Sequence, residues 1–289
     1  MIAILGATGY IGRSLARDMA AGDETALALF ARDPAALAHE TWPTHVSLRR
    51  LADFHAGDFS LVINAIGAGD PGRVASMGAE ILDVTQAFDE RVLSTLGPGT
   101  RYVFLSSGAA HTLPDGAATA GPLPPYTVSK LQAEARHRAM ADRAILDLRI
   151  FGYADRCISQ TGSFFLAELA RSVATGQPFV TNRADMVRDY AGARELGALI
   201  RCWWASPGAN QALDLYTRAP LSKIDLLSIV APRYGLEIAY TTSLTDSPTG
   251  AKPVYAPTSR AAATLGYLPH RDSTAIVLDT LDAIAAAKA

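Results

Sequence analysis

The chain opens on a short apolar run, residues 2–5, and three glycines spaced three residues apart follow at once. In a strand–turn–helix unit, the first glycine permits a tight turn, the second lets the backbone approach a pyrophosphate, and the third lets helix and strand pack closely. The N–H groups at the start of the helix attract phosphates. The spacing alone also suits a glycine-rich turn without a ligand, but its place after the first strand favours a dinucleotide-binding site. We expect that site to include Gly6, Thr8, Gly9, Tyr10, Ile11 and Gly12.

Strand and helix patterns alternate through the first half of the chain. Strands are predicted over residues 2–5, 26–31, 46–51, 61–66, 102–105 and 144–150, and the longest helices over residues 74–96 and 126–142. Such alternation is typical of a parallel sheet covered by helices on both faces. The predicted fold class is therefore α/β, with a Rossmann-type doubly wound parallel sheet over residues 1–151.

The pattern changes after residue 151. Helices are predicted over residues 164–174, 221–234 and 274–287, and short strands over residues 186–190, 212–216 and 236–240. Pro232 makes the last turn of the second of these helices doubtful. We expect residues 152–289 to form mainly a smaller C-terminal substrate-binding lobe, with elements of about residues 186–217 returning to the Rossmann domain.

Charge and composition exclude several functional classes. The 289 residues include 26 basic and 28 acidic ones, a net charge of −2, which gives no electrostatic footprint for nucleic acid or an anionic membrane. No apolar run approaches the ~20 residues of a membrane-spanning helix, and no signal-peptide pattern is present. The six histidines show no ligand spacing, so no metal site is expected. Together with only two cysteines, these features predict a cytoplasmic protein with a small-molecule substrate.

The end of the second predicted strand bears on which dinucleotide binds. NAD-binding folds usually place an acidic residue there, roughly 20 residues past the glycines, but this chain has Phe30 and Ala31, followed by Arg32. An arginine can pair with a 2′-phosphate through two hydrogen bonds, and Arg13 could assist it from the first helix. Asp33 could instead turn inward and hold the ribose. We expect NADP(H) to be preferred, with NAD(H) as the alternative.

A second group of residues follows the fifth predicted strand. Tyr126 and Lys130 are four residues apart and share one helix face, near the sheet edge where ligands of such folds bind. A lysine ammonium favours the phenolate of a nearby tyrosine, whose pKa is otherwise about 10. Ser106 and Ser107 end the strand, where a hydroxyl can polarise a carbonyl oxygen. The alternative is an ordinary surface pair beside serines that satisfy local backbone.

Together these motifs resemble the extended short-chain dehydrogenase/reductases, also called the NAD-dependent epimerase/dehydratase family, over nearly the whole chain. The resemblance implies a catalytic serine at Ser107, an acid/base at Tyr126 and a coenzyme-binding lysine at Lys130. It implies a substrate contact, commonly to a diphosphate, at Arg188 in the segment Arg-Asp-Tyr. Further coenzyme contacts are implied at Asn64, Ala65, Ile66 and Gly67. Residues 259–269 match a late motif of the family.

The chain also departs from the family's pattern. Gly152 stands where UDP-galactose 4-epimerase and its relatives carry asparagine, and residues 247–250, Ser-Pro-Thr-Gly, replace an Arg-Pro-Gly-Asp segment. The redox residues are present while two nucleotide-sugar anchors are altered, which favours an NADP(H)-dependent ketoreductase acting on a (deoxy)sugar nucleotide. A nucleotide-sugar 4-epimerase remains an alternative. A non-catalytic NADP(H)-sensing regulator is another, although such proteins tend to lose the Tyr–Lys pair.

Assembly is the last expectation. The predicted helices over residues 74–96 and 126–142 carry apolar residues on more than one face. Family members often pair these helices across a two-fold axis, so the resemblance implies a homodimer. The alternative is that both faces are buried within one chain.

Overall fold

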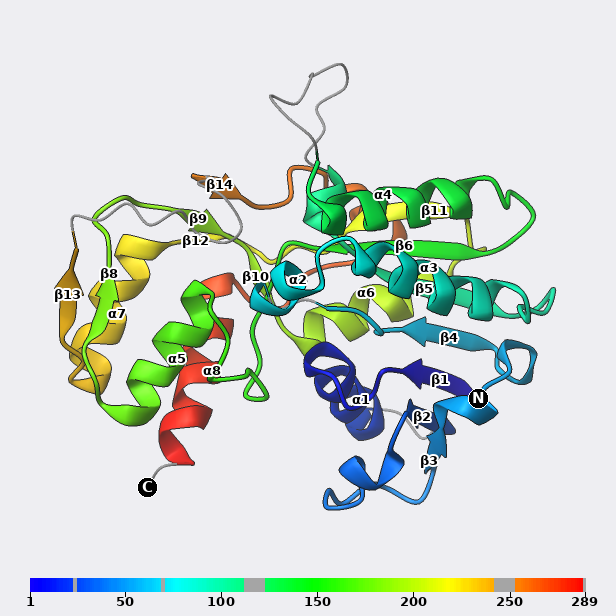
Figure 1. Cartoon of the computed structure of the whole chain (residues 1–289), viewed down its shortest axis with the longest axis horizontal. Helices are drawn as coiled ribbons and strands as arrows, with labels where there is room; N and C mark the ends of the chain where they lie inside the picture. Colours follow the sequence, from blue (N-terminus) through cyan, green and yellow to red (C-terminus); the bar gives the residue numbers. More distant parts are fainter. Residues whose placement is uncertain (23–24, 69–70, 112–122, 242–252, 288–289) are drawn as a thin grey trace.

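A parallel sheet forms the larger part of the molecule (Figure 1). The computed structural model describes residues 1–22, 25–68, 71–111, 123–241 and 253–287. Within these residues, seven parallel strands pair in the order β3-β2-β1-β4-β5-β6-β11. Their bounds are Ile2–Leu5 (β1), Leu27–Ala31 (β2), Val46–Arg50 (β3), Leu61–Asn64 (β4), Arg101–Ser107 (β5), Ile145–Ile150 (β6) and Gln211–Asp214 (β11). The order reverses between β1 and β4, where doubly wound sheets bind their ligands.

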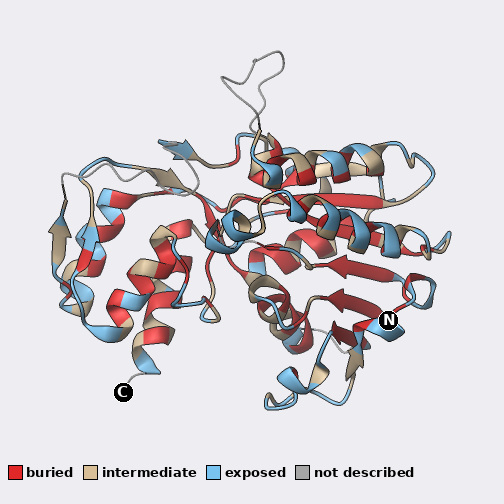
Figure 2. Ribbon diagram, viewed as in Figure 1, coloured by how far each residue is buried: buried red, intermediate tan, exposed pale blue. Residues whose placement is uncertain are grey.

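Helices cover both faces of the sheet because successive strand residues point to opposite sides. In β1, Ile2 and Ile4 pack with α1 (Tyr10–Gly22) and α6 (Ala193–Ala205). Ala3 and Leu5 belong to the opposite core, which includes side chains of α3 (Glu80–Leu93) and α4 (Pro125–Arg138). Figure 2 shows the strands as an almost continuous buried layer. The α/β Rossmann-type fold predicted from the sequence is confirmed.

A smaller lobe lies beside the carboxyl edge of the sheet (Figure 1). Its apolar core joins α5 (Phe165–Thr175), α7 (Lys223–Tyr234) and α8 (Ser273–Ala286). Its short strands are β7 (Gly152–Tyr153), β8 (Phe179–Thr181), β9 (Val187–Arg188), β10 (Tyr190–Ala191), β12 (Leu221–Ser222), β13 (Ile238–Tyr240) and β14 (Val254–Tyr255). Between β10 and β12 the chain contributes α6, which packs on α1, and β11, which joins the large sheet.

The remaining elements are single turns and short helices. They are α2 (Pro71–Met77) and the 3₁₀ turns η1 (Pro34–Leu37), η2 (Leu51–Asp53), η3 (Ala56–Asp58), η4 (Gly108–His111) and η5 (Ala261–Leu265). Among the helices that the structure describes, none is long and apolar enough to cross a bilayer.

Three helices differ from their predictions. The helix predicted over residues 126–142 ends four residues early, at Arg138. The single helix predicted over residues 74–96 is broken into α2 and α3 around Gly78, whose φ of +52° does not fit a right-handed helix. Pro232 was expected to disturb the end of the helix over residues 221–234, yet α7 continues through it to Tyr234. The start of α7 is later than predicted, because Ser222 caps it by accepting a hydrogen bond from the N–H of Asp225 at 3.3 Å.

Candidate active site

The three glycines form a tight turn at the carboxyl end of β1. Gly6 has a φ of +74°, a conformation that strains residues with a side chain. Its carbonyl accepts the N–H of Gly9 at 2.9 Å. A Cβ on Gly12 would lie 2.3 Å from the same carbonyl oxygen, so only glycine lets α1 approach β1 this closely. The turn leaves Thr8 and Gly9 exposed at its rim, as a phosphate cradle requires.

Tyr10 extends from this turn toward the smaller lobe. Its hydroxyl donates to the carbonyl of Tyr153 at 3.3 Å and accepts the N–H of Asp155 at 2.9 Å. The two rings of Tyr10 and Tyr153 meet edge to face at 5.4 Å. The side chain of Tyr10 therefore ties the first helix to the segment after β7, and Ile11 beside it is half-buried.

The end of β4 forms the opposite wall of the cradle. The N–H of Ala65 donates to the carbonyl of Leu5 at 3.0 Å, and a Cβ on Gly6 would lie 3.0 Å from the carbonyl of Ala65. Asn64 is buried and orients the segment, because its side-chain oxygen accepts the N–H of Ile66 at 3.0 Å. The predicted coenzyme residues of the two strand ends thus lie side by side.

The end of β2 presents a cation to solvent. Arg32 is exposed, whereas the carboxylate of Asp33 accepts the N–H of Ala35 at 3.0 Å and caps η1. Arg13, on α1, lies 3.5 Å from a carboxylate oxygen of Glu40. Both side chains are exposed, but the carboxylate of Asp33 is engaged in capping η1, whereas Arg32 presents a guanidinium to solvent.

Ser107, Tyr126 and Lys130 come together beside this cradle. Ser107 is the last residue of β5 and Tyr126 lies in the first turn of α4, near enough for the Ser107 hydroxyl to lower the pKa of the Tyr126 phenol. The Nζ of Lys130 lies 5.8 Å from the centroid of the Tyr126 ring and donates to the carbonyl of Leu105 at 2.9 Å. A Cβ on Gly67 would lie 4.0 Å from the same Nζ, so this lysine links the end of β4 to the tyrosine.

Burial dominates the electrostatics of this group. It raises the pKa of Tyr126, and the hydrogen bond with Ser107 opposes that shift. Burial also lowers the pKa of Lys130 to about 8, opposed by the carboxylates of Asp89, Asp147 and Glu134. The direction for Tyr126 is opposite to the lowering expected from a neighbouring ammonium, because desolvation of the phenolate is the largest cause of the shift.

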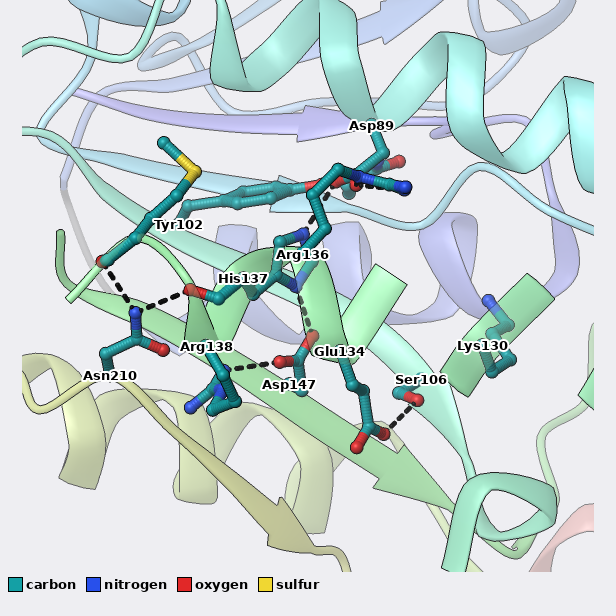
Figure 3. Close-up of polar contacts among 12 residues, drawn as sticks. Asp89, Tyr102, Ser106, Lys130, Glu134, Arg136, His137, Arg138, Asp147 and Asn210 are labelled. Carbon is teal, nitrogen blue, oxygen red and sulfur yellow. Dashed lines mark hydrogen bonds and ion pairs between the residues drawn. The ribbon is translucent and has the colours of Figure 1, made fainter. Parts of the chain in front are cut away.

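A buried polar network lies behind Lys130 (Figure 3). His137 is fully buried and bridges two carboxylates, with its ring nitrogens 2.9 Å from Asp89 and 2.6 Å from Asp147. Tyr102 donates to Asp89 at 2.9 Å and accepts from the amide of Asn64 at 2.9 Å. The network therefore fixes Asn64, which orients the predicted coenzyme segment. Its other members come from four elements, α3, β5, α4 and β6, and sequence analysis did not identify them.

The smaller lobe brings two further side chains to this edge. Arg188 on β9 is half-buried and donates to its own neighbour, the carbonyl of Val187, at 2.8 Å. Burial lowers the pKa of its guanidinium. Tyr255 on β14 lies in register with Arg188, and its ring packs on Phe151 at a centroid distance of 5.1 Å. Sequence analysis missed Tyr255, although it stands four residues before the late family motif.

Close packing explains why position 152 is a glycine instead of the asparagine of the family's pattern. A Cβ there would lie 2.6 Å from the carbonyl oxygen of Asp189 and 2.8 Å from the ring of Tyr190, because β7 pairs directly with β10. No asparagine side chain fits this position. The second departure, residues 247–250, lies outside the described residues. Within the described part of the chain, no group of three or more His, Cys, Asp or Glu is placed to hold a metal ion.

Comparison with known proteins places these features in context. The model of the NAD dependent epimerase/dehydratase family matches residues 2–208. No curated protein matches the chain. A UDP-glucuronic acid 4-epimerase variant from Bacillus cereus, solved with a substrate analogue and NAD, superposes with a TM-score of 0.80 at 15% identity over 98% of both chains.

Two further solved structures have the same architecture. The UDP-N-acetylglucosamine 4-epimerase of Methanobrevibacter ruminantium M1 has a TM-score of 0.80 at 14% identity, over 99% of this chain and 98% of that one. The dTDP-glucose 4,6-dehydratase of Bacillus anthracis, solved with NAD, has a TM-score of 0.74 at 13% identity, over 98% and 95%. Likeness at such identities establishes the fold of the whole chain.

Proposed function

The chain belongs to the NAD-dependent epimerase/dehydratase family, a family of enzymes, and within it we propose an NADP(H)-preferring ketoreductase that acts on a keto group of a (deoxy)sugar nucleotide. The observation that carries the proposal is the meeting of Ser107, Tyr126 and Lys130 at the carboxyl edge of the sheet, next to the glycine turn. The turn and the end of β4 fit a dinucleotide, because the glycines leave room where any Cβ would collide.

The side chains of the protein donate the proton and orient the substrate and the coenzyme. When bound, the coenzyme supplies a hydride from nicotinamide C4. Tyr126 donates its phenolic proton to the oxygen of the carbonyl that is being reduced, and Ser107 donates a hydrogen bond to the same oxygen. Lys130, protonated at pH 7 because its pKa is about 8, has two N–H donors left for a coenzyme ribose beyond its bond to Leu105.

Arg188 supports an anionic substrate. Its half-buried guanidinium donates to a backbone carbonyl of its own strand. A charged group in such a position gains most from a phosphate or carboxylate partner. We propose that it binds the diphosphate of the sugar nucleotide. The closed position at Gly152 removes one nucleotide-sugar anchor of the UDP-galactose 4-epimerase pattern, which counts against that epimerase activity.

The end of β2 supports the coenzyme preference. Asp33 is engaged by the N–H of Ala35 and does not turn inward, while Arg32 is exposed. A 2′-phosphate bound there would pair with a guanidinium instead of meeting a carboxylate.

A nucleotide-sugar 4-epimerase is the second candidate, because the structural neighbours include UDP-sugar 4-epimerases that cover nearly the whole chain. The two activities differ in their demand for coenzyme: a ketoreductase consumes NADPH in proportion to product, whereas an epimerase inverts C4 with no net consumption.

The test is to incubate the purified chain with a panel of UDP- and dTDP-linked sugars, with NADPH or NADH added to the 4-keto-6-deoxy sugars and NAD⁺ or NADP⁺ added to the 4-hydroxy sugars. Absorbance at the reduced nicotinamide band follows reduction, and proton NMR of the sugar follows C4 inversion. NADPH oxidation with a 4-keto sugar supports the ketoreductase. Inversion at C4 without net oxidation of NADPH would support the epimerase instead. If neither reaction is observed, both proposed activities are wrong.

A further inference from the structure

A buried hydrogen bond of fixed direction joins Asn64 to Tyr102. The N–H of Ile66 can only donate, so the atom of the Asn64 amide that it meets at 3.0 Å is the oxygen. The amide nitrogen of Asn64 therefore faces the hydroxyl of Tyr102, to which it donates at 2.9 Å. Both side chains are buried, so neither group has access to bulk water.

Asp89 sets the direction of the next bond (Figure 3). The hydroxyl of Tyr102 has one proton and lies 2.9 Å from a carboxylate oxygen of Asp89. An ionised carboxylate only accepts, so Tyr102 donates to Asp89 and keeps a lone pair for the amide of Asn64. A protonated Asp89 would instead donate to Tyr102, whose own proton would then face the amide nitrogen. The bonds therefore keep their direction because Asp89 is ionised.

Two cations of α4 keep Asp89 ionised. The ring nitrogens of His137 lie 2.9 Å from Asp89 and 2.6 Å from Asp147. Both nitrogens must carry a proton to donate to two carboxylates, so His137 is an imidazolium. Arg136 donates twice to the second oxygen of Asp89, at 3.1 and 2.8 Å. Burial acts to raise the pKa of Asp89, but its bonds with His137, Arg136 and Tyr102 outweigh burial and lower the pKa below its usual value.

Ile66 is the residue through which these bonds reach the coenzyme site. Its side chain packs against the glycine turn, because a Cβ on Gly6 would lie 3.1 Å from the Cγ1 of Ile66. The next residue, Gly67, stands beside Lys130, whose Nζ would lie 4.0 Å from a Cβ on that glycine. The bond from the N–H of Ile66 to Asn64 therefore holds the segment between the glycine turn and the Tyr–Lys pair.

We propose that Tyr102 is a positioning residue for the coenzyme: it connects the fixed charge of Asp89 to Asn64, and so holds residues 64–67 in the conformation that binds the coenzyme. The inference rests on the proposed function, in which residues 64–67 line the coenzyme. It assigns a role in coenzyme binding to a buried cluster of charges that the proposed reaction does not use.

The first test is the coenzyme affinity of Tyr102→Phe, measured by fluorescence titration with NADPH and NADH. The variant keeps the ring, which packs edge to face on His137 at 5.6 Å, and loses only the hydroxyl. The dissociation constants of both coenzymes should rise by about three- to tenfold, because the amide of Asn64 loses a buried acceptor. Unchanged affinity for both coenzymes would overturn the proposal.

Tyr267→Phe is the matched control, because it separates loss of stability from loss of positioning. Tyr267 is also fully buried, and its hydroxyl donates to the carbonyl of Tyr216 at 2.7 Å. Tyr216 follows β11, the edge strand that β5 and β6 separate from β4. Both variants should lower the melting temperature, but only Tyr102→Phe should weaken coenzyme binding. Equal weakening in the two variants would mean that Tyr102 acts through stability alone, and would overturn the proposal.

Asn64→Ser tests the same bond from its other end. A serine hydroxyl can accept the N–H of the residue two positions on, as Asn64 does for Ile66, but serine is too short to reach Tyr102. It should weaken coenzyme binding about as much as Tyr102→Phe, and the double variant should bind no more weakly than either single one. Multiplying effects would overturn the proposal. If Tyr102→Phe does not fold, wild-type affinity in Asn64→Ser would overturn it as well.

Turnover distinguishes this inference from the function on which it rests. On whichever substrate proves active, Tyr102→Phe should raise the coenzyme KM by about three- to tenfold and leave kcat within about twofold, because Tyr102 orients the coenzyme segment and not the reacting oxygen. Coenzyme binding by the wild type with an unaffected Tyr102→Phe would overturn this inference alone. A wild type that binds neither coenzyme would count against the proposed function.

Discussion

Arg32 and Asp33 show how a single local contact bears on coenzyme choice. The carboxylate that could have held a ribose is used to cap η1, and the neighbouring guanidinium is left exposed. A capping aspartate stabilises its turn by about 1 kcal/mol. This position of the Asp33 side chain is therefore stable without any bound coenzyme.

Arg32→Ala should therefore weaken NADPH binding by roughly ten- to a hundredfold and leave NADH binding nearly unchanged, because only the 2′-phosphate loses a charge-assisted partner. Fluorescence titration of both coenzymes measures this. Arg183→Ala, an exposed arginine of the smaller lobe, should change neither affinity. Tighter binding of NADH than of NADPH by the wild type would show that Arg32 does not recognise a phosphate.

His137 makes stability depend on pH. Burial acts to lower its pKa, but hydrogen bonds with Asp147 and Asp89 outweigh burial and raise it from 6.5 to about 9. A raised pKa stabilises the fold fully below pH 6.5, and the contribution is lost as pH rises through 9. The free energy of unfolding should fall by about 1–2 kcal/mol between pH 6.5 and 8. Urea denaturation at both pH values measures the fall, and His39→Gln, an exposed control, should not alter it. A flat profile would mean that His137 is neutral in the folded protein.

The elements around the cradle depend on close approach of backbones. In α1, Gly12 lies at the crowded start and Gly22 at the open end, where a Cβ would meet nothing within 4 Å. Changing Gly12 or Gly22 to alanine therefore tests the same substitution at a crowded and at an open position of one helix.

Gly12→Ala should destabilise the fold by about 1–3 kcal/mol, because its Cβ must displace the Gly6 carbonyl, and it should weaken coenzyme binding at least tenfold. Gly22→Ala should be neutral or stabilise the helix by up to about 1 kcal/mol. Thermal melting and coenzyme titration of both variants test this. Equal effects from the two alanines would show that the close approach at position 12 is not required.

Sequence analysis predicted the elements whose signals are local. The glycine turn, the i, i+4 pair of α4 and the apolar strands each lie within a few residues, so spacing alone locates them. Tyr255 comes from a two-residue strand without periodicity, and His137 is paired with carboxylates 48 and 10 residues away. Such contacts form only when distant segments meet in the tertiary structure, so no local sequence pattern predicts them. The break at Gly78 was missed because apolar residues continue on both sides of it.

At the scale of the whole molecule, the proposed reaction takes place where two cores meet. The sheet and its helix α4 supply the glycine turn, Ser107, Tyr126 and Lys130, while the smaller lobe supplies Arg188, which lies in register with Tyr255. On the sheet face that carries α3 and α4, the two helices bury Val92 and Ala133 in one core and leave Ala87 and Ala135 exposed.

We expect that exposed face to pair two chains across a two-fold axis. Light scattering at micromolar concentration should give twice the mass of one chain, and Ala135→Arg should shift the mass to that of a monomer by placing like charges opposite each other. Ala38→Arg, an exposed alanine after η1, should remain dimeric. If the wild-type protein has the mass of a monomer, the predicted dimer is wrong.

The most direct test of the account is the turnover of Tyr126→Phe. The substitution keeps the ring and removes the hydroxyl that lies near Ser107, so coenzyme affinity and melting temperature should stay close to wild type. Turnover should fall by about 10²–10⁴-fold, the usual effect of losing a positioned acid. Tyr234→Phe, which loses a hydrogen bond to Asp282 at 2.7 Å in the smaller lobe, should keep full turnover. Near-wild-type turnover of Tyr126→Phe would contradict the assignment of Tyr126 as the proton donor, and with it the mechanism proposed for this site.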